Sequence, residues 1–122
     1  MKRIGIIDIG TNTTRIIVFD LSESPPAVVF EEDRVTRLGR GLAGRRLQEE
    51  SMQRTLKVAE EYKKRANEAG AERIMAVGTS AVRDAANRDD FAARLRALGV
   101  EPRVLSGEEE AGYVYRGVEM GR

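Results

Sequence analysis

The sequence predicts an α/β domain with a mixed five-stranded sheet, its elements following in the order β-β-β-α-β-α-β-α. Three apolar, β-branched runs separated by turn residues occupy the first third of the chain, which is typical of an antiparallel meander. Segments with helical spacing then alternate with short apolar runs, which favours strands joined by helices. With 122 residues the chain is expected to form one domain, with helices packed on both sides of its sheet.

The predicted meander comprises strands at residues 4–9, 15–20 and 28–39. The first two are rich in isoleucine and valine, and the third becomes more polar toward its end. Pro25 and Pro26 mark the turn before the third strand, because proline cannot donate to the ladder of a central strand. A basic, glycine-containing loop is expected at residues 40–47.

The clearest helix spans residues 49–69, where apolar side chains recur at helical spacing, and Gly70 is placed to end it. The remaining elements are shorter. They are a buried strand at 73–78, one or two helical turns at 79–85, a helix at 89–99, a strand at 102–106 and a last helix at 107–120.

Composition excludes several kinds of chemistry. The chain has no cysteine and no histidine, so carboxylates would have to carry any acid–base step near neutral pH. A net charge of +1 argues against a nucleic-acid partner. No apolar stretch approaches the roughly 20 residues that span a bilayer. The N-terminus shows no signal-peptide pattern, and we therefore expect a cytoplasmic protein without a membrane partner.

The first candidate site is the polar stretch "DIGTNTT" between the first two strands. Asp8 ends a buried strand, where a carboxylate is costly unless its charge is used. Gly10 is expected to turn the backbone with positive φ, and Thr11, Asn12 and Thr13 supply the donors of an anion-binding concavity. An acid beside such a concavity repels an anion unless a cation lies between them, so Asp8 suits Mg²⁺, bound directly or through water.

The alternative for this stretch is an ordinary polar hairpin loop in which Asp8 accepts hydrogen bonds from turn N–H groups. The extended pattern, with a buried strand on each side of D-x-G-T-N-T, favours phosphate binding instead.

The second candidate site is "VGTSAVRDA" at residues 77–85, where a strand ends in Gly78 and a helix begins. The first N–H groups of such a helix point at the edge of the sheet and suit an anion. Arg83 lies one turn further on, within reach of that anion, where its guanidinium can bind phosphate through two hydrogen bonds. A plain capped helix with Arg83 on the surface is an equally good interpretation of this segment alone.

The third candidate site is "LSGEEEAGYVYRG" at residues 105–117. Ser106 and Glu109 fit a capping box, and acids in a first helical turn also suit the helix dipole. That structural role leaves Glu110, which shares a helix face with Val114 and Gly117, the face expected against the sheet. A partly buried carboxylate there would have a raised pKa and could act as a general base.

These segments together, in this order, resemble the exopolyphosphatase / guanosine pentaphosphate phosphohydrolase family, which belongs to the superfamily of sugar kinases, heat-shock 70 chaperones and actin. The resemblance runs the whole length of the chain and rests on "GIIDIGTNTTRIIVFD", "RLGRGLAGRRLQEESMQRTL", "AVGTSAVRDAANRDDF" and "VLSGEEEAGYVYRGV". The first motif is shared by many kinases of the superfamily, whereas its combination with "TSAVRDA" and "SGEEEA" is much more specific.

The resemblance implies a ribonuclease-H-like (actin-like ATPase) domain. By it, Asp8 and residues 10–13 form the first phosphate loop, Arg83 contacts the phosphate chain, and Glu110 activates the water that attacks the terminal phosphorus. It also implies Mg²⁺ as cofactor, inorganic polyphosphate or guanosine pentaphosphate as substrate, and a homodimer for the full-length protein. Arg15 lies on the strand after the loop, where family members vary.

One feature of the family is not matched. Its active site lies between two domains, and the second domain brings a phosphate loop of the D-x-G-G-G-S kind, which this sequence does not contain. We therefore expect residues 1–122 to be the single N-terminal domain of a longer enzyme, inactive alone. Two alternatives remain at this point: half of a sugar or carboxylate kinase of the same superfamily, and a non-enzymatic module that binds anions or assembles with itself.

Overall fold

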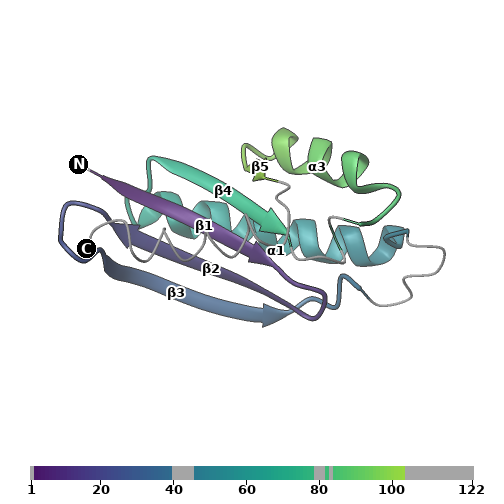
Figure 1. The fold of residues 1–122 in the computed structure, drawn as a ribbon, viewed down its shortest axis with the longest axis horizontal. Coiled ribbons are helices and arrows are strands. Elements are labelled where there is room, and N and C mark those ends of the chain that lie inside the picture. The colour runs from purple at the N-terminus through teal and green to yellow at the C-terminus, as the bar shows by residue number, and fades with distance from the viewer. Residues whose placement is uncertain (1, 40–45, 79–81, 83, 104–122) are drawn as a thin grey trace.

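The computed structural model describes residues 2–39, 46–78, 82 and 84–103, which form one sheet with helices packed on it (Figure 1). The strands are β1 (Arg3–Ile9), β2 (Thr13–Asp20), β3 (Ala27–Val35), β4 (Arg73–Gly78) and β5 (Glu101–Arg103). The described helices are α1 (Glu49–Glu68) and α3 (Arg88–Ala97).

The sheet is mixed and has the strand order β3-β2-β1-β4-β5. β1, β2 and β3 pair antiparallel as a meander, whereas β4 runs parallel to β1, and β5 runs parallel to β4. The predicted mixed five-stranded sheet is therefore confirmed, with β1 at its centre. The parallel pairing of β1 and β4 matters for the site because it brings the carboxyl ends of both strands to one edge.

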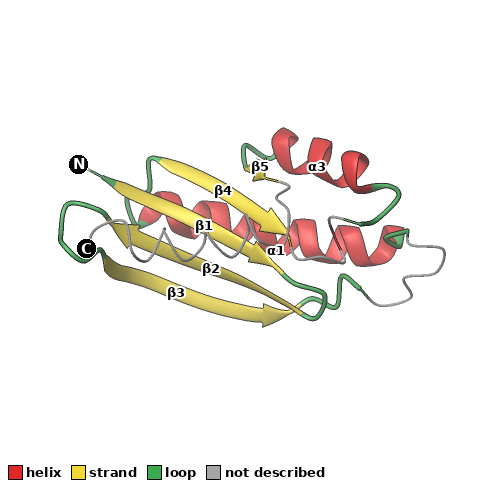
Figure 2. Cartoon of the chain, viewed as in Figure 1, coloured by secondary structure: helices red, strands yellow, loops and turns green. Residues whose placement is uncertain are grey.

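The main core lies between one face of the sheet and the two helices (Figure 2). Ile7 of β1 and Ile16 of β2 are fully buried against α1, which contributes Tyr62. Helical spacing explains this arrangement, because residues three and four apart share one face of a helix. Gly5 permits the close approach of α1, since a Cβ at that position would lie 3.3 Å from the Cβ of Ala66. 

The second face of the sheet is also apolar. Ile6, Phe19 and Val77 form a buried cluster there. Partly buried apolar residues surround them, namely Ile4, Ile17 and Leu21. Both described helices contribute side chains to the core on the opposite face. The helix predicted at 107–120 lies outside the described residues, so helices on both sides of the sheet remain a prediction.

Element boundaries differ from the predicted ones chiefly at β3. The sequence predicts a strand to residue 39, but β3 ends at Val35, because residues 36–39 turn away to contact the β1–β2 loop. Arg37 has a φ of 52°, which is incompatible with an extended strand. β2 begins at Thr13 rather than at residue 15, and β5 begins at Glu101 rather than at residue 102.

Side chains join the beginning of α1 to α3. Asn87, just before α3, accepts a hydrogen bond from Leu47 N–H at 2.8 Å and donates one to the Leu47 carbonyl at 2.9 Å. Arg94 donates to both carboxylate oxygens of Glu49, at 2.6 and 2.9 Å. Among the described residues, no helix is long and apolar enough to cross a membrane.

Candidate active site

The strand register brings two of the predicted site segments together. Ile9 at the end of β1 lies opposite Gly78 at the end of β4, and Asp8 lies opposite Val77. The β1–β2 loop and the end of β4 therefore lie at the same edge of the sheet (Figure 1). Ligands of α/β sheets bind outside the carboxyl ends of such strands. This edge is the candidate active site.

The β1–β2 loop is a tight turn with firmly held carbonyl groups. Gly10 N–H donates to the Thr13 carbonyl at 2.9 Å. The Asn12 carbonyl accepts two backbone hydrogen bonds from the chain after β3, and the Thr11 carbonyl accepts one. These contacts define the loop conformation before any ligand arrives.

The expectation of positive φ at Gly10 is wrong. Among the described glycines, positive φ occurs at Gly70 and Gly99, so the turn forms without a left-handed residue at Gly10. The left-handed position near the loop is Arg37 instead, with a φ of 52°. A non-glycine residue in that region costs about 1–3 kcal/mol and persists only where its surroundings hold it.

Asp8 is a partly buried carboxylate on the same face of the sheet as the Ile6 cluster. Burial raises its pKa above the usual range, and the nearby positive charge of Arg15 offsets part of that rise. Arg15 lies directly opposite Asp8 in the strand register, but its guanidinium forms ion pairs with Glu31 at 3.6 Å and Asp33 at 3.5 Å. Within the described part of the chain, Asp8 has no salt bridge and accepts no hydrogen bond from the turn.

The surroundings of the Asp8 carboxylate suit a ligand for a phosphate-bound metal ion better than a residue that stabilises the turn. An aspartate that stabilised the hairpin would accept N–H bonds from it, and the described residues give the Asp8 carboxylate none. The described residues also hold no cluster of three or more acidic side chains suited to a metal. Mg²⁺ does not require such a cluster, because it usually keeps several waters and binds one or two carboxylates together with substrate phosphates. Asp8 as the single protein ligand fits that mode.

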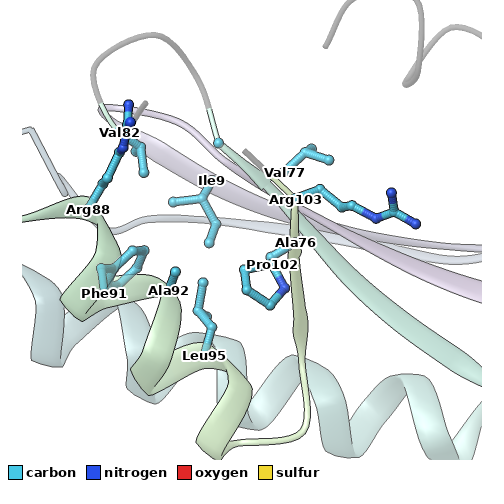
Figure 3. A pocket seen from close by; sticks show the side chains of 11 residues that line it. Ile9, Ala76, Val77, Val82, Arg88, Phe91, Ala92, Leu95, Pro102 and Arg103 are labelled. Carbon is cyan, nitrogen blue, oxygen red and sulfur yellow. The ribbon is translucent and has the colours of Figure 1, made fainter. Parts of the chain in front are cut away.

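A mostly apolar pocket lies between α3 and the sheet (Figure 3), and Gly78 is one of the residues that line it. A Cβ at Gly78 would lie 3.0 Å from Cγ1 of Val82, so a larger residue would press on the Val82 side chain. Phe91 and Leu95 of α3 point into the same space. The lining is mostly apolar, with Arg88 and Arg103 also contributing to it, so we interpret the pocket as part of the packing that supports this edge of the sheet.

Two predicted site residues lie outside the described residues. They are Arg83, the predicted phosphate ligand, and Glu110, the predicted base. The structure brings Asp8, residues 10–13 and Gly78 to one edge of the sheet.

The sequence analysis did not predict that residues 36–39 contact the β1–β2 loop, or that Arg54 contacts residues 36–39. The stretch "RLGRGL" has no periodicity or charge pattern that indicates such contacts, and its partners are distant in the sequence. The resemblance, which includes this stretch, was the one available signal.

Fold and site together define a class: α/β domains that present a polar, D-x-G-T-containing loop at the carboxyl edge of a mixed sheet. A model of the Ppx/GppA phosphatase family matches residues 17–121, and the chain belongs to that family. This confirms the family indicated by the sequence motifs.

Known proteins agree with this assignment. The chain is 34% identical over 134 residues to "Exopolyphosphatase 2" of Mycobacterium tuberculosis, covering 99% of this chain and 42% of the relative. It is 33% identical over 114 residues to "Guanosine-5'-triphosphate,3'-diphosphate pyrophosphatase" of Photobacterium profundum, covering 92% of this chain and 23% of that protein. The chain thus spans less than half the length of these relatives.

Solved structures confirm the predicted fold. The crystal structure of the Aquifex aeolicus member of the Ppx/GppA family superposes with a TM-score of 0.83 at 34% sequence identity. The match covers 96% of this chain and 39% of the Aquifex chain. The ribonuclease-H-like, actin-like ATPase architecture is therefore that of this chain.

Proposed function

We propose that this chain is the first-phosphate-loop half of a phosphohydrolase that releases terminal phosphate from inorganic polyphosphate, guanosine pentaphosphate or both. The observation that carries the proposal is Asp8, a partly buried carboxylate with no hydrogen bond or salt bridge from the described residues, beside a preformed loop at the carboxyl edge of the sheet. Relatives named for hydrolysis of each substrate support both possibilities.

In this proposal the N–H and hydroxyl groups of residues 10–13 hold the phosphate chain, and Arg83 neutralises part of its charge. Asp8 would hold Mg²⁺ through an oxygen or a bound water, and the ion would supply further positive charge at the phosphate oxygens. Glu110 would take a proton from the attacking water. Positioning and charge neutralisation supply most of the catalysis of phosphoryl transfer.

In this proposal, parts of the protein beyond this half complete the substrate-binding site. A second domain would close the other side of the cleft, and we extend the proposal to the homodimer and the cytoplasmic location expected from the sequence. The 122-residue chain alone should release negligible phosphate, because half a cleft cannot exclude water or hold both ends of a phosphate chain.

The test is phosphate release by the complete protein. With Mg²⁺ present, inorganic phosphate should accumulate from long-chain polyphosphate or from guanosine pentaphosphate, and chelation of the metal should stop it. ATP with a panel of sugars and short carboxylates serves as the control for a kinase. Phosphate transfer to one of these acceptors, without release from either proposed substrate, would contradict the proposal.

A further inference from the structure

The chain immediately after β3 is bonded to the β1–β2 loop. Thr36 N–H and Arg37 N–H both donate to the Asn12 carbonyl at 2.9 Å, and Gly39 N–H donates to the Thr11 carbonyl at 2.9 Å. We call residues 36–39 the loop support. Arg37, with a φ of 52°, turns the chain sharply between these two donors and Gly39.

The loop support is itself held by one side chain of α1. Arg54 donates from Nε to the Thr36 carbonyl at 2.6 Å and from Nη2 to the Arg37 carbonyl at 3.2 Å. Ser51, one turn earlier on the helix, accepts a third bond from Nη2 at 3.3 Å. A guanidinium presents its donors in a rigid plane, so these bonds fix the two carbonyls relative to the helix.

Two further contacts fix the position of the loop support. The hydroxyls of Thr36 and Thr14 are buried and 2.7 Å apart, which ties the support to β2. A Cβ at Gly39 would lie 3.1 Å from the Cβ of Thr11, so the support and the loop are in close backbone contact.

Because of peptide geometry, these contacts also constrain the backbone N–H groups that we propose bind phosphate. A trans peptide unit is planar, and its N–H points opposite to its carbonyl. Holding the Thr11 and Asn12 carbonyls therefore sets the directions of the Asn12 and Thr13 N–H groups, which belong to the same peptide units. The Arg54 guanidinium thus orients the loop support, and the loop support orients the N–H donors of the β1–β2 loop.

We propose that Arg54 is a positioning residue for phosphate binding: it orients the donors of the β1–β2 loop through residues 36–39 without touching the substrate. The inference rests on the proposed function for its kinetic consequence, whereas its structural consequence can be measured without any ligand.

The kinetic test uses Arg54→Gln in the complete protein, with Arg65→Gln as the matched control. Arg65 lies on the same helix and pairs with Glu32 at 2.9 Å. Because the loop donors contact phosphate before and during the reaction, Arg54→Gln should raise KM for polyphosphate more than it lowers kcat. We expect kcat/KM to fall about 10- to 100-fold. Arg65→Gln should stay within about twofold, since its contacts do not reach the loop. 

A merely structural role gives a different result. Loss of folded protein would lower the apparent kcat at unchanged KM, and melting temperatures recorded for each variant would reveal it. Arg54→Lys should restore part of the lost affinity, because an ammonium can bond one carbonyl but cannot span both. An Arg54→Gln protein with unchanged KM would overturn the inference.

Hydrogen exchange separates this inference from the proposed function. In the ligand-free complete protein, backbone amides of residues 10–14 and 36–39 should exchange faster in Arg54→Gln than in the parent. Their exchange rates should be unchanged in Arg65→Gln. If exchange is faster in Arg54→Gln but the parent protein hydrolyses neither substrate, the proposed function is rejected and the role of Arg54 in orienting the loop is retained. Equal exchange in parent and Arg54→Gln would reject that role even in an active enzyme.

Gly39→Ala tests the same path if Arg54→Gln fails to fold. The added methyl group would press on Thr11 and displace the loop without altering α1. It should raise KM in the same way, and an unchanged KM for Gly39→Ala would count against the inference.

Discussion

Asp8→Asn is expected to reduce hydrolysis of the preferred substrate by the complete protein about 100-fold or more. It should at the same time leave the melting temperature of the 122-residue chain unchanged or raise it at neutral pH. In the proposed function Asp8 holds Mg²⁺, and activity should fall because a neutral amide is a weaker ligand for that cation than a carboxylate. Stability does not fall, because burial of the Asp8 carboxylate raises its pKa and its ionised form therefore opposes folding.

The pH dependence of this effect has a definite sign. The folded-state pKa of Asp8 is raised, so its ionisation costs stability at any pH above that pKa. As the pH falls below the folded-state pKa toward the ordinary value of about 3.9, the carboxyl becomes protonated and the cost disappears. The stabilisation of Asp8→Asn over the parent should therefore be largest at neutral pH and should shrink in acid.

Asp20→Asn is the matched control. Hydrogen bonds from the hydroxyl and the N–H of Ser22 lower the pKa of Asp20, with a further contribution from Arg3, whose Nε lies 3.1 Å from the carboxylate. A carboxylate with a lowered pKa stabilises the fold above its ordinary pKa, and this stabilisation is lost as the pH falls through the folded-state value. Asp20→Asn should therefore destabilise the chain at neutral pH. A strongly destabilised Asp8→Asn chain would instead favour the hairpin-turn interpretation of Asp8.

Tyr62→Ala is expected to cost about 3–5 kcal/mol of unfolding free energy. Tyr62 is fully buried at the centre of α1, and its ring lies in the core between α1 and the sheet. Removing it would leave a cavity that the packed strands cannot close. Domains of this size are stable by about 5–15 kcal/mol, so this loss would remove a large share of the total stability. Urea unfolding followed by circular dichroism measures the loss.

Tyr62→Phe is the control for the hydroxyl. The Tyr62 hydroxyl donates to the Thr14 carbonyl at 3.4 Å, a long bond, so its removal should cost about 1 kcal/mol or less. Burial also raises the pKa of Tyr62 to about 12. Because the unfolded side chain ionises near pH 10, stability should fall as the pH rises from about 10 toward that value. A Tyr62→Ala chain as stable as Tyr62→Phe would show that the ring does not anchor α1.

Local sequence patterns determined most of the secondary structure. α1 was predictable because its apolar residues recur with the period of a helix, and it ends as expected before Gly70, which has a φ of 88°. β1 and β4 were predictable as buried, β-branched runs. The position of Asp8 at the end of a buried strand was equally evident, because it depends on neighbours in the sequence.

The way in which the β1–β2 loop is held depends on contacts between residues that are far apart in the sequence. Thr36 contacts Thr14 across 22 positions, and Arg54 reaches the Thr36 carbonyl across 18 positions. These contacts ended β3 at Val35 and placed the left-handed turn at Arg37 rather than at Gly10. The register that sets Ile9 opposite Gly78 likewise depends on packing between distant strands. Local propensity reports the conformation that a segment favours alone, whereas hydrogen bonds between distant segments form only once the chain has closed its core, and they then override that preference.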